Sequence, residues 1–242
     1  MGAQSSSSAA ACAWGVREAE HASGIVWLHG LGDTGEGWQA IIQHELKLDQ
    51  RLLPCRYVFP LAPERTITCN GGASCTSWFD MDVLPIGVQD LPPLHGCSLE
   101  SAEDSVRQVH GLVDSLRQEG IPADRIYVGG FQQGGALALL AGLTYQQRLA
   151  GCIVFSGLLL GADRVGTLAG PAARGLRVFW GHGLHDGVFD VSLQDEGCNA
   201  VKEFGLDITS RRYPMGHSWH PQELQEATEF LNDMPLRVPE FD

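Results

Sequence analysis

The sequence predicts an α/β fold in which a mainly parallel sheet carries helices on both faces. From residue 24 onward, short apolar runs bounded by glycine or proline alternate with stretches of helical periodicity, the pattern of successive strand–helix–strand units. A chain of 242 residues that is 44% hydrophobic can bury one sizeable core, and it shows no internal repeat. We therefore expect one domain at residues 24–234, with an arm at 1–23 before it and a tail at 235–242 after it.

Six segments are expected to form strands; most are short apolar runs that glycine or proline ends, and helix candidates separate the later ones. In chain order they are 24–30, 56–63, 125–130, 150–157, 176–183 and 207–214. Helices are expected at 98–119, 133–142, 192–204 and 221–233. The first of these helices is the clearest, since apolar residues recur at helical spacing from Val106 to Leu116 and Gly120 can end it.

Residues 64–97 interrupt this alternation. They have little periodicity and contain turn-rich sequences such as TCNGGASC and LPPLHG. We expect an irregular excursion over the surface, of the kind that often forms a lid or a binding loop. A merely decorative insertion is the alternative.

Charge and cysteine content exclude several classes of function. The formal net charge of −13 argues against binding nucleic acid or an anionic membrane surface by electrostatic attraction. Seven cysteines, with no C-x-x-C motif and no secretory signal before them, favour a reducing, cytoplasmic location. No apolar run approaches the ~20 residues that a membrane-spanning helix requires.

The amino-terminal sequence MGAQSS fits the pattern for N-myristoylation at Gly2. Cys12 lies close enough to accept a second acyl chain, which matters because one chain alone binds membranes only marginally. These residues predict a peripheral membrane contact. The alternative is a disordered arm rich in serine and alanine that happens to begin with Met-Gly.

Four segments place polar groups after predicted strands, at the edge of the sheet where the carboxyl ends of parallel strands meet. They are LHGLGDTGEGW (28–38), GGFQQGG (129–135), GHGLHDGVF (181–189) and YPMGHSWHP (213–221). The first offers main-chain amides to developing negative charge, although similar turns also bind phosphate. The others carry a strand-to-helix turn, Asp186 and His217, the chain order of hydrolases in which an acid orients an imidazole that activates a serine.

Each of these groups has an alternative interpretation. Asp186 could cap a helix, and His217 could be an ordinary loop histidine. His182, His185 and His220 lie nearby in the sequence, but no carboxylate or thiolate accompanies them at the spacing of a metal site. We expect neither a metal nor another cofactor.

The resemblance to a known family rests on six stretches in this order and spacing. They are LHGLGDTGEGW, FPLAPERTIT, SWFDMDVL, GIPADRIYVGGFQQGGALAL, GHGLHDGVF and GHSWH. Over about residues 24–234 the chain resembles the acyl-protein thioesterase and lysophospholipase-like family of small α/β-hydrolases. That resemblance implies a cytosolic esterase acting on S-palmitoyl-cysteine, lysophospholipids or small esters. It also implies Asp186 as the acid, His217 as the base, and the main-chain amides of Leu31 and Gln133 as the oxyanion hole.

The sequence departs from this family at the nucleophile and in the expected acyl channel. The family's turn is similar to Gly-Phe-Ser-Gln-Gly-Gly, whereas this chain has Gln132 at the serine position. Leu158 stands where the family has tryptophan, and Gly187, Val188 and Phe189 replace its Pro-Leu-Val. Because these changes remain mostly apolar, we expect an acyl channel lined by apolar side chains. The candidates are Leu84, Leu158, Val188 and Phe189.

Gln132 decides whether hydrolysis is expected. A carboxamide has no ionisable hydroxyl and cannot replace serine as a nucleophile. Ser77 and Ser218 lack a turn of the required kind around them, so neither is expected to substitute. We predict an acyl-binding pseudoenzyme in which Gln132, Asp186 and His217 converge. The alternatives are an active esterase in which Gln132 is an introduced change, and weak hydrolysis by water that His217 activates.

Overall fold

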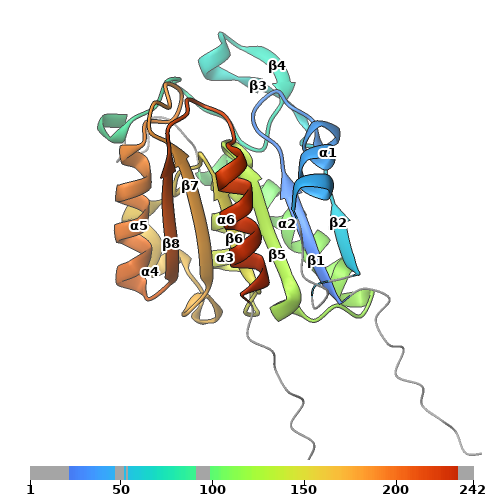
Figure 1. Cartoon of the computed structure of the whole chain (residues 1–242). Coiled ribbons are helices and arrows are strands. Elements are labelled where there is room, and N and C mark those ends of the chain that lie inside the picture. Colours follow the sequence, from blue (N-terminus) through green and yellow to red (C-terminus); the bar gives the residue numbers. More distant parts are fainter. Residues whose placement is uncertain (1–21, 47–51, 53, 91–98, 234–242) are drawn as a thin grey trace, which may run out of the picture.

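A six-stranded parallel sheet forms the centre of the computed structural model, which describes residues 22–46, 52, 54–90 and 99–233 (Figure 1). The strand order is β2-β1-β5-β6-β7-β8. The strands are β1 (Ser23–Leu28), β2 (Cys55–Val58), β5 (Ile126–Phe131), β6 (Gly151–Phe155), β7 (Arg177–Gly183) and β8 (Asp207–Tyr213). Every neighbouring pair is parallel, which confirms the predicted sheet and all six predicted strands.

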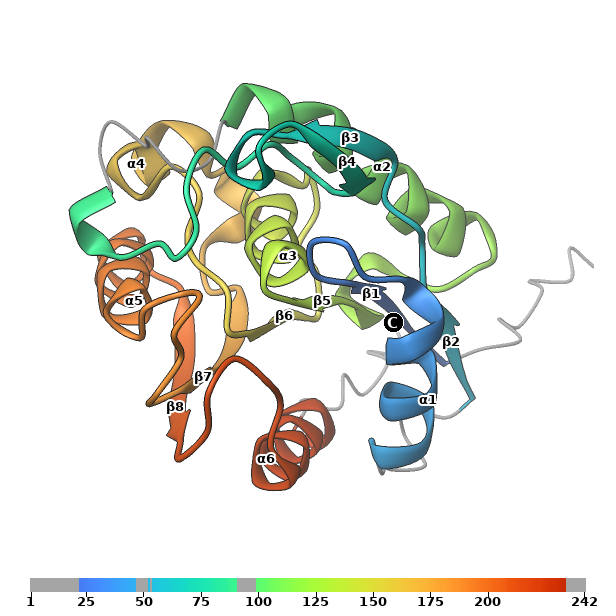
Figure 2. The ribbon, with the colours of Figure 1, turned by 90° about the horizontal axis from the view of Figure 1, so that it is seen from above.

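Helices cover both faces of the sheet (Figure 2). One face carries α2 (Leu99–Gln118), α3 (Gln133–Thr144), α4 (Val165–Leu168) and α5 (Ser192–Phe204), and the other carries α1 (Gly35–Glu45) and α6 (Pro221–Asn232). Alternate residues of each strand therefore pack into separate cores: Val26 and Leu28 into one, Ile25 and Trp27 into the other. The four predicted helices are present, and α3 is buried from Gln133 to Leu143.

Helices α1 and α4 and strands β3 (Glu64–Ile67) and β4 (Ala73–Thr76) were not predicted. Helix α1 begins at Gly35, inside the stretch expected to be only a glycine-rich turn, because Trp38 and Ile42 lie four residues apart and both are buried. In the excursion, β3 and β4 form an antiparallel hairpin that turns through Gly71 and Gly72, both with positive φ. Most hairpin residues are exposed, so the sequence there lacks the alternation that reveals a half-buried strand.

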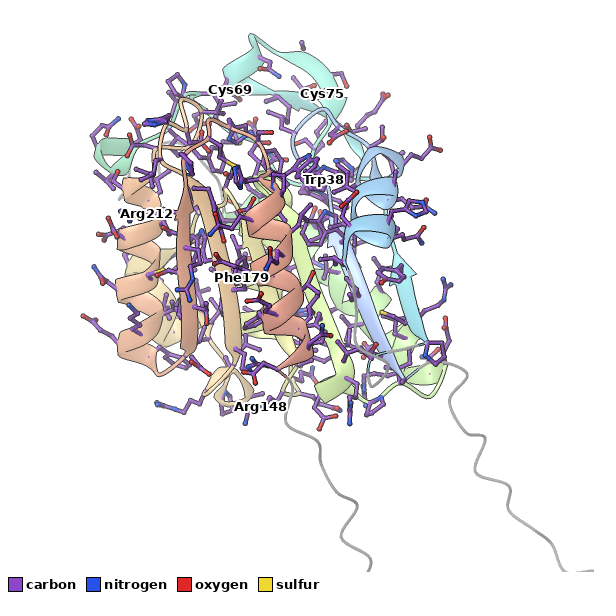
Figure 3. All side chains as sticks on the ribbon, in the orientation of Figure 1. Trp38, Cys69, Cys75, Arg148, Phe179 and Arg212 are labelled. Atoms are coloured by element: carbon purple, nitrogen blue, oxygen red, sulfur yellow. The ribbon has the colours of Figure 1, made fainter. Side chains whose placement is uncertain are left out.

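The hairpin extends beyond the carboxyl edge of the sheet. Figure 3 shows Cys69 and Cys75 of this segment at the opposite end of the molecule from Arg148, which precedes β6. The loops expected to carry function leave their strands at the same edge as the hairpin. No helix among the described residues is long and apolar enough to cross a membrane. Gly2, Cys12 and the tail at 235–242 lie outside the described residues.

Candidate active site

Gln132 occupies the tight turn between β5 and α3. Its φ of 53° and ψ of −116° lie in a region that non-glycine residues seldom adopt and that often marks a functional site. The turn lies close against β1: a Cβ atom built on Gly134 would lie 2.1 Å from the carbonyl oxygen of Leu28. The glycine therefore allows the helix to start directly behind the strand. The backbone of a nucleophile turn is present, although the residue in it is glutamine.

The side chain of Gln132 points into the glycine-rich turn that follows β1. The main-chain N–H of Leu31 donates a hydrogen bond of 2.8 Å to Oε1 of Gln132. A Cβ atom on Gly30 would lie 3.0 Å from the same oxygen, and Gln132 is only 6% exposed. One of the two amides expected to form the oxyanion hole therefore already has an acceptor.

His29 orders the turn that carries this amide. It is buried, and burial lowers its pKa, which favours the neutral imidazole. The N–H of Ala62 donates to Nε2 (3.0 Å), so the proton is on Nδ1, which lies 2.7 Å from the carbonyl oxygen of Gly30. Trp78 Nε1 donates to the carbonyl of His29 at 2.8 Å. His29 was not predicted as a site residue, although it lies within the quoted stretch at 28–38, directly before Gly30.

Gln133 has a structural role that its sequence position does not reveal. Its main-chain N–H lies in the first turn of α3, where no carbonyl four residues back can accept from it. Its side chain is fully buried: Oε1 accepts from the N–H of Trp78 (3.1 Å), and Nε2 donates to the carbonyl of Phe79 (2.7 Å) and to Ser77 Oγ (3.0 Å). Ser77 is thus buried and bonded, whereas Ser218 is exposed. Neither serine lies at a strand-to-helix turn.

Asp186 and His217 form a hydrogen-bonded pair at the same edge of the sheet. Nδ1 of His217 lies 2.8 Å from Oδ2 and 3.0 Å from Oδ1 of Asp186. Because a carboxylate only accepts, Nδ1 carries the proton and Nε2 remains free to act as a base. The imidazole also packs against Phe131, with ring centroids 4.8 Å apart, so it lies beside the residue that precedes Gln132. Within the described residues, no hydrogen bond joins Gln132 to His217.

The Asp186 carboxylate is buried and held from several sides. Burial by itself would raise its pKa, but hydrogen bonds from His182 and His217 outweigh burial and hold the pKa well below the ordinary value. The N–H groups of Val188 and Phe189 also donate to Oδ1, each at 2.9 Å. Asp186 therefore stays charged and keeps the imidazole of His217 in one orientation.

His182 is a second imidazole on this carboxylate that sequence reasoning did not assign. It is fully buried, with Nε2 2.8 Å from the carbonyl of Phe189 and 3.4 Å from Oδ2 of Asp186. Its position near the end of β7, four residues before Asp186, was the available signal. From the sequence, His182 was considered only as a metal ligand. No group of three or more metal-binding side chains occurs in the described part of the chain.

The excursion at 64–90 connects three loops of the site. The N–H of Gly32 donates to the carbonyl of Thr76 at 2.8 Å, which joins β4 to the glycine-rich turn. Gln133 joins the excursion to the turn at Gln132, as described above. Ile86 pairs with the loop after β7: its N–H donates to the carbonyl of Val188, and its carbonyl accepts from the N–H of Asp190, each at 2.9 Å. The segment is therefore a support for the site and not a decorative insertion.

The four acyl-channel candidates fall into two groups. Leu158 and Phe189 are 1% and 0% exposed and belong to the core, so they do not line an open channel. Leu84 and Val188 are partly buried against that core. A hollow of about 210 Å³ lies beside Asp186, between Pro85 and Asp190. A larger hollow of about 950 Å³ lies between α6 and strands β7 and β8, and no predicted site residue lines it.

Several known proteins resemble this chain in both sequence and fold. The phospholipase/carboxylesterase family matches residues 16–234. Acyl-protein thioesterase 1 of Gibberella zeae is 33% identical over 215 residues, which are 88% of this chain and 90% of that protein. Carboxylesterase SOBER1 of Arabidopsis thaliana is 33% identical over 208 residues, or 86% of this chain and 88% of that protein.

Solved structures agree with these relatives. The crystal structure of Arabidopsis thaliana SOBER1 has a TM-score of 0.79 to this chain at 30% identity, covering 86% of this chain and 97% of that one. That of Zea mays acyl-protein thioesterase 2 has a TM-score of 0.69 at 27% identity, covering 87% and 93%. The matched residues include the whole sheet, the turn at Gln132 and the Asp186–His217 pair, and the chain therefore belongs to the phospholipase/carboxylesterase family of α/β-hydrolases.

Proposed function

We propose that this protein binds the acyl ligands of its family, S-acylated cysteines, lysophospholipids or small esters, without hydrolysing them at family rates. One observation carries the proposal: Gln132 occupies the nucleophile turn beside an ordered Asp186–His217 pair. A carboxamide cannot give a proton to His217 and attack a carbonyl, so no acyl-enzyme forms. Losing the nucleophile of such a triad costs about 10⁶ in turnover in a serine protease.

Restoring the missing hydroxyl tests this proposal. Gln132→Ser should raise turnover of a short-chain thioester by about 10³-fold or more over the wild type, because the acid, the base and the Leu31 amide are in place. The variant should also react with a fluorophosphonate, which needs an activated serine. Gln132→Ala is the matched control, since it removes the carboxamide without supplying a nucleophile, and it should gain neither property.

One outcome would contradict the proposal: a wild-type protein that cleaves a palmitoylated peptide at family-like rates and loses this activity on His217→Ala. A folded Gln132→Ser variant that neither cleaves the thioester nor takes the label would show instead that the channel or the geometry of Asp186 and His217 has changed, which would strengthen the binding role.

Weak hydrolysis by water is the second candidate function, and the free Nε2 of His217 favours it. Any such activity should disappear in His217→Ala and should persist in Gln132→Ala.

For its location, we propose a cytoplasmic protein that contacts membranes through acylation at Gly2 and Cys12. The motif at the amino terminus supports this proposal. Gly2→Ala should shift the protein from the membrane fraction to the soluble fraction of a cell lysate, and Cys12→Ser should weaken attachment further than loss of a remote cysteine such as Cys198→Ser. Equal membrane fractions for wild type and Gly2→Ala would contradict it.

A further inference from the structure

The Gln132 side chain has the covalent shape of a serine that carries an acyl group. In an acyl-serine, the atoms beyond Cβ are the ester oxygen, the carbonyl carbon with its oxygen, and the first carbon of the acyl chain. In glutamine they are Cγ, Cδ with Oε1, and Nε2. Both groups are planar at the carbonyl, and the carbonyl carbon is the second atom beyond Cβ in each. The turn at Gln132 therefore holds a carbonyl where the acyl-enzyme of an active relative would hold one.

The carboxamide of Gln132 makes a contact that the carbonyl of an acyl-serine would make at this turn. Oε1 accepts from the N–H of Leu31 at 2.8 Å, as the oxygen of an acyl-serine would from an oxyanion-hole amide. The same oxygen lies against Gly30, where a Cβ atom would approach it to 3.0 Å. Gln132 keeps the positive φ of the turn and is 6% exposed, so the carboxamide is enclosed at this place and does not extend into solvent.

We propose that Gln132 is a specificity-determining residue whose carboxamide acts as a built-in analogue of an acyl-serine. It occupies the Leu31 amide of the oxyanion hole, so the site binds lipid-modified cysteines with little distinction between an acyl and an alkyl linkage. This inference rests on the proposed ligand-binding function. The reason is competition: a ligand carbonyl must either displace Oε1 from the Leu31 N–H or bond to the Gln133 N–H alone, and both choices lose one hydrogen bond of the oxyanion hole.

Two probes that cannot be hydrolysed test the inference without any turnover. One is a cysteine peptide with a long-chain ketone, in which a methylene separates the acyl carbonyl from sulfur. The other is the same peptide with a saturated thioether chain of equal length. For wild type, the two dissociation constants should agree within about threefold. In Gln132→Ala the ketone should bind about tenfold more tightly than the thioether, since its carbonyl gains the Leu31 amide.

Two further variants separate shape from chemistry. Gln132→Glu keeps the length and an acceptor oxygen, so it should resemble wild type and show no preference for the ketone. Gln132→Asn is one methylene shorter and should behave like the alanine variant, because its oxygen cannot reach Leu31. A wild type that prefers the ketone as strongly as Gln132→Ala does would overturn the inference while leaving the loss of hydrolysis intact.

Amide hydrogen exchange at Leu31 tests, without a ligand, whether the Gln132 carboxamide occupies the Leu31 N–H. Exchange should be about tenfold or more slower in wild type and Gln132→Glu than in Gln132→Ala and Gln132→Asn. The N–H of Gly32, which bonds to the carbonyl of Thr76, is the internal control and should exchange alike in all four proteins. Equal exchange at Leu31 in wild type and Gln132→Ala would also overturn the inference. If the exchange pattern holds and neither probe binds, the claimed specificity and the proposed ligand binding fail together.

Discussion

The acid–base side and the nucleophile side of this site lie at one edge of the sheet, but the first holds a carboxylate–imidazole pair and the second holds a carboxamide. On the acid–base side, Asp186 is buried, charged and bonded to the imidazole of His217. On the nucleophile side, the turn keeps its strained backbone while Gln132 fills the carbonyl position and bonds to Leu31. The strained backbone of the turn thus carries a glutamine side chain.

This difference shows that the turn depends on its neighbours and not on serine. Gly130 and Gly134 allow α3 to start against β1: a Cβ atom on Gly130 would lie 2.5 Å from the carbonyl oxygen of Leu28. The N–H of Gln132 donates to the carbonyl of Phe155 at 2.9 Å, which involves only main-chain atoms. A change of side chain at position 132 therefore alters the chemistry and leaves the backbone conformation in place.

The largest effect is expected on the acid–base side. In a Gln132→Ser chain, Asp186→Asn should lower kcat by about 10³-fold, because an amide cannot hold His217 in the tautomer that leaves Nε2 free. Asp190→Asn is the control: its carboxylate is exposed and, among the described residues, accepts hydrogen bonds from Ser192, so kcat should change less than about threefold. A loss below tenfold for Asp186→Asn would show that this side does not drive the chemistry.

A smaller effect is expected on the nucleophile side. There, unlike Gln132, the side chain of Gln133 stabilises the fold through buried hydrogen bonds to Trp78 and Phe79. Gln133→Ala should lower the free energy of unfolding by about 3 kcal/mol, since it leaves the N–H of Trp78 and the carbonyl of Phe79 buried and unpaired. Urea denaturation measures the change. Gln39→Ala removes an exposed glutamine and should stay within about 0.5 kcal/mol of wild type. If both variants changed the free energy of unfolding by a similar amount, the hydrogen bonds between Gln133 and the excursion would not support the site.

The smallest effect is expected at Glu223, a buried carboxyl group whose pKa shifts in the opposite direction from that of Asp186. Burial raises the pKa of Glu223 to about 8, with Glu226 adding to the shift, and Oε1 of Glu223 has no partner among the described residues. The folded protein thus keeps a proton that the unfolded chain loses above its ordinary pKa of 4.5. The contribution of Glu223 to stability is therefore fully present below that value and is lost as the pH rises to about 8.

Glu223→Gln should flatten this part of the pH profile. The variant should be about 2 kcal/mol more stable than wild type at pH 8 and should show little gain at pH 5. Thermal unfolding across this range measures it, with the exposed Glu229→Gln on the same helix as the control. A constant difference between variant and wild type at every pH would mean that Glu223 does not titrate as its burial requires.

Much of this protein was determined by local sequence. The six parallel strands and helices α2, α3, α5 and α6 were predicted from local patterns of the chain, mainly short apolar runs and helical periodicity. The order of turn, acid and histidine placed Gln132, Asp186 and His217 at one sheet edge, because parallel strands end together. The proposed lack of a nucleophile also rests on the sequence alone, since a carboxamide lacks a reactive hydroxyl in any fold.

Other features were decided only by tertiary structure. That Oε1 of Gln132 bonds to the N–H of Leu31, 101 residues earlier, depends on how closely the turn packs against β1. That Gln133 supports the excursion and His182 shares the carboxylate of Asp186 depends on contacts between segments with no common pattern. Local sequence encodes helices, strands and turns through short-range sterics and hydrophobic spacing. Which buried polar groups become partners is decided only when packing brings distant segments within hydrogen-bonding distance.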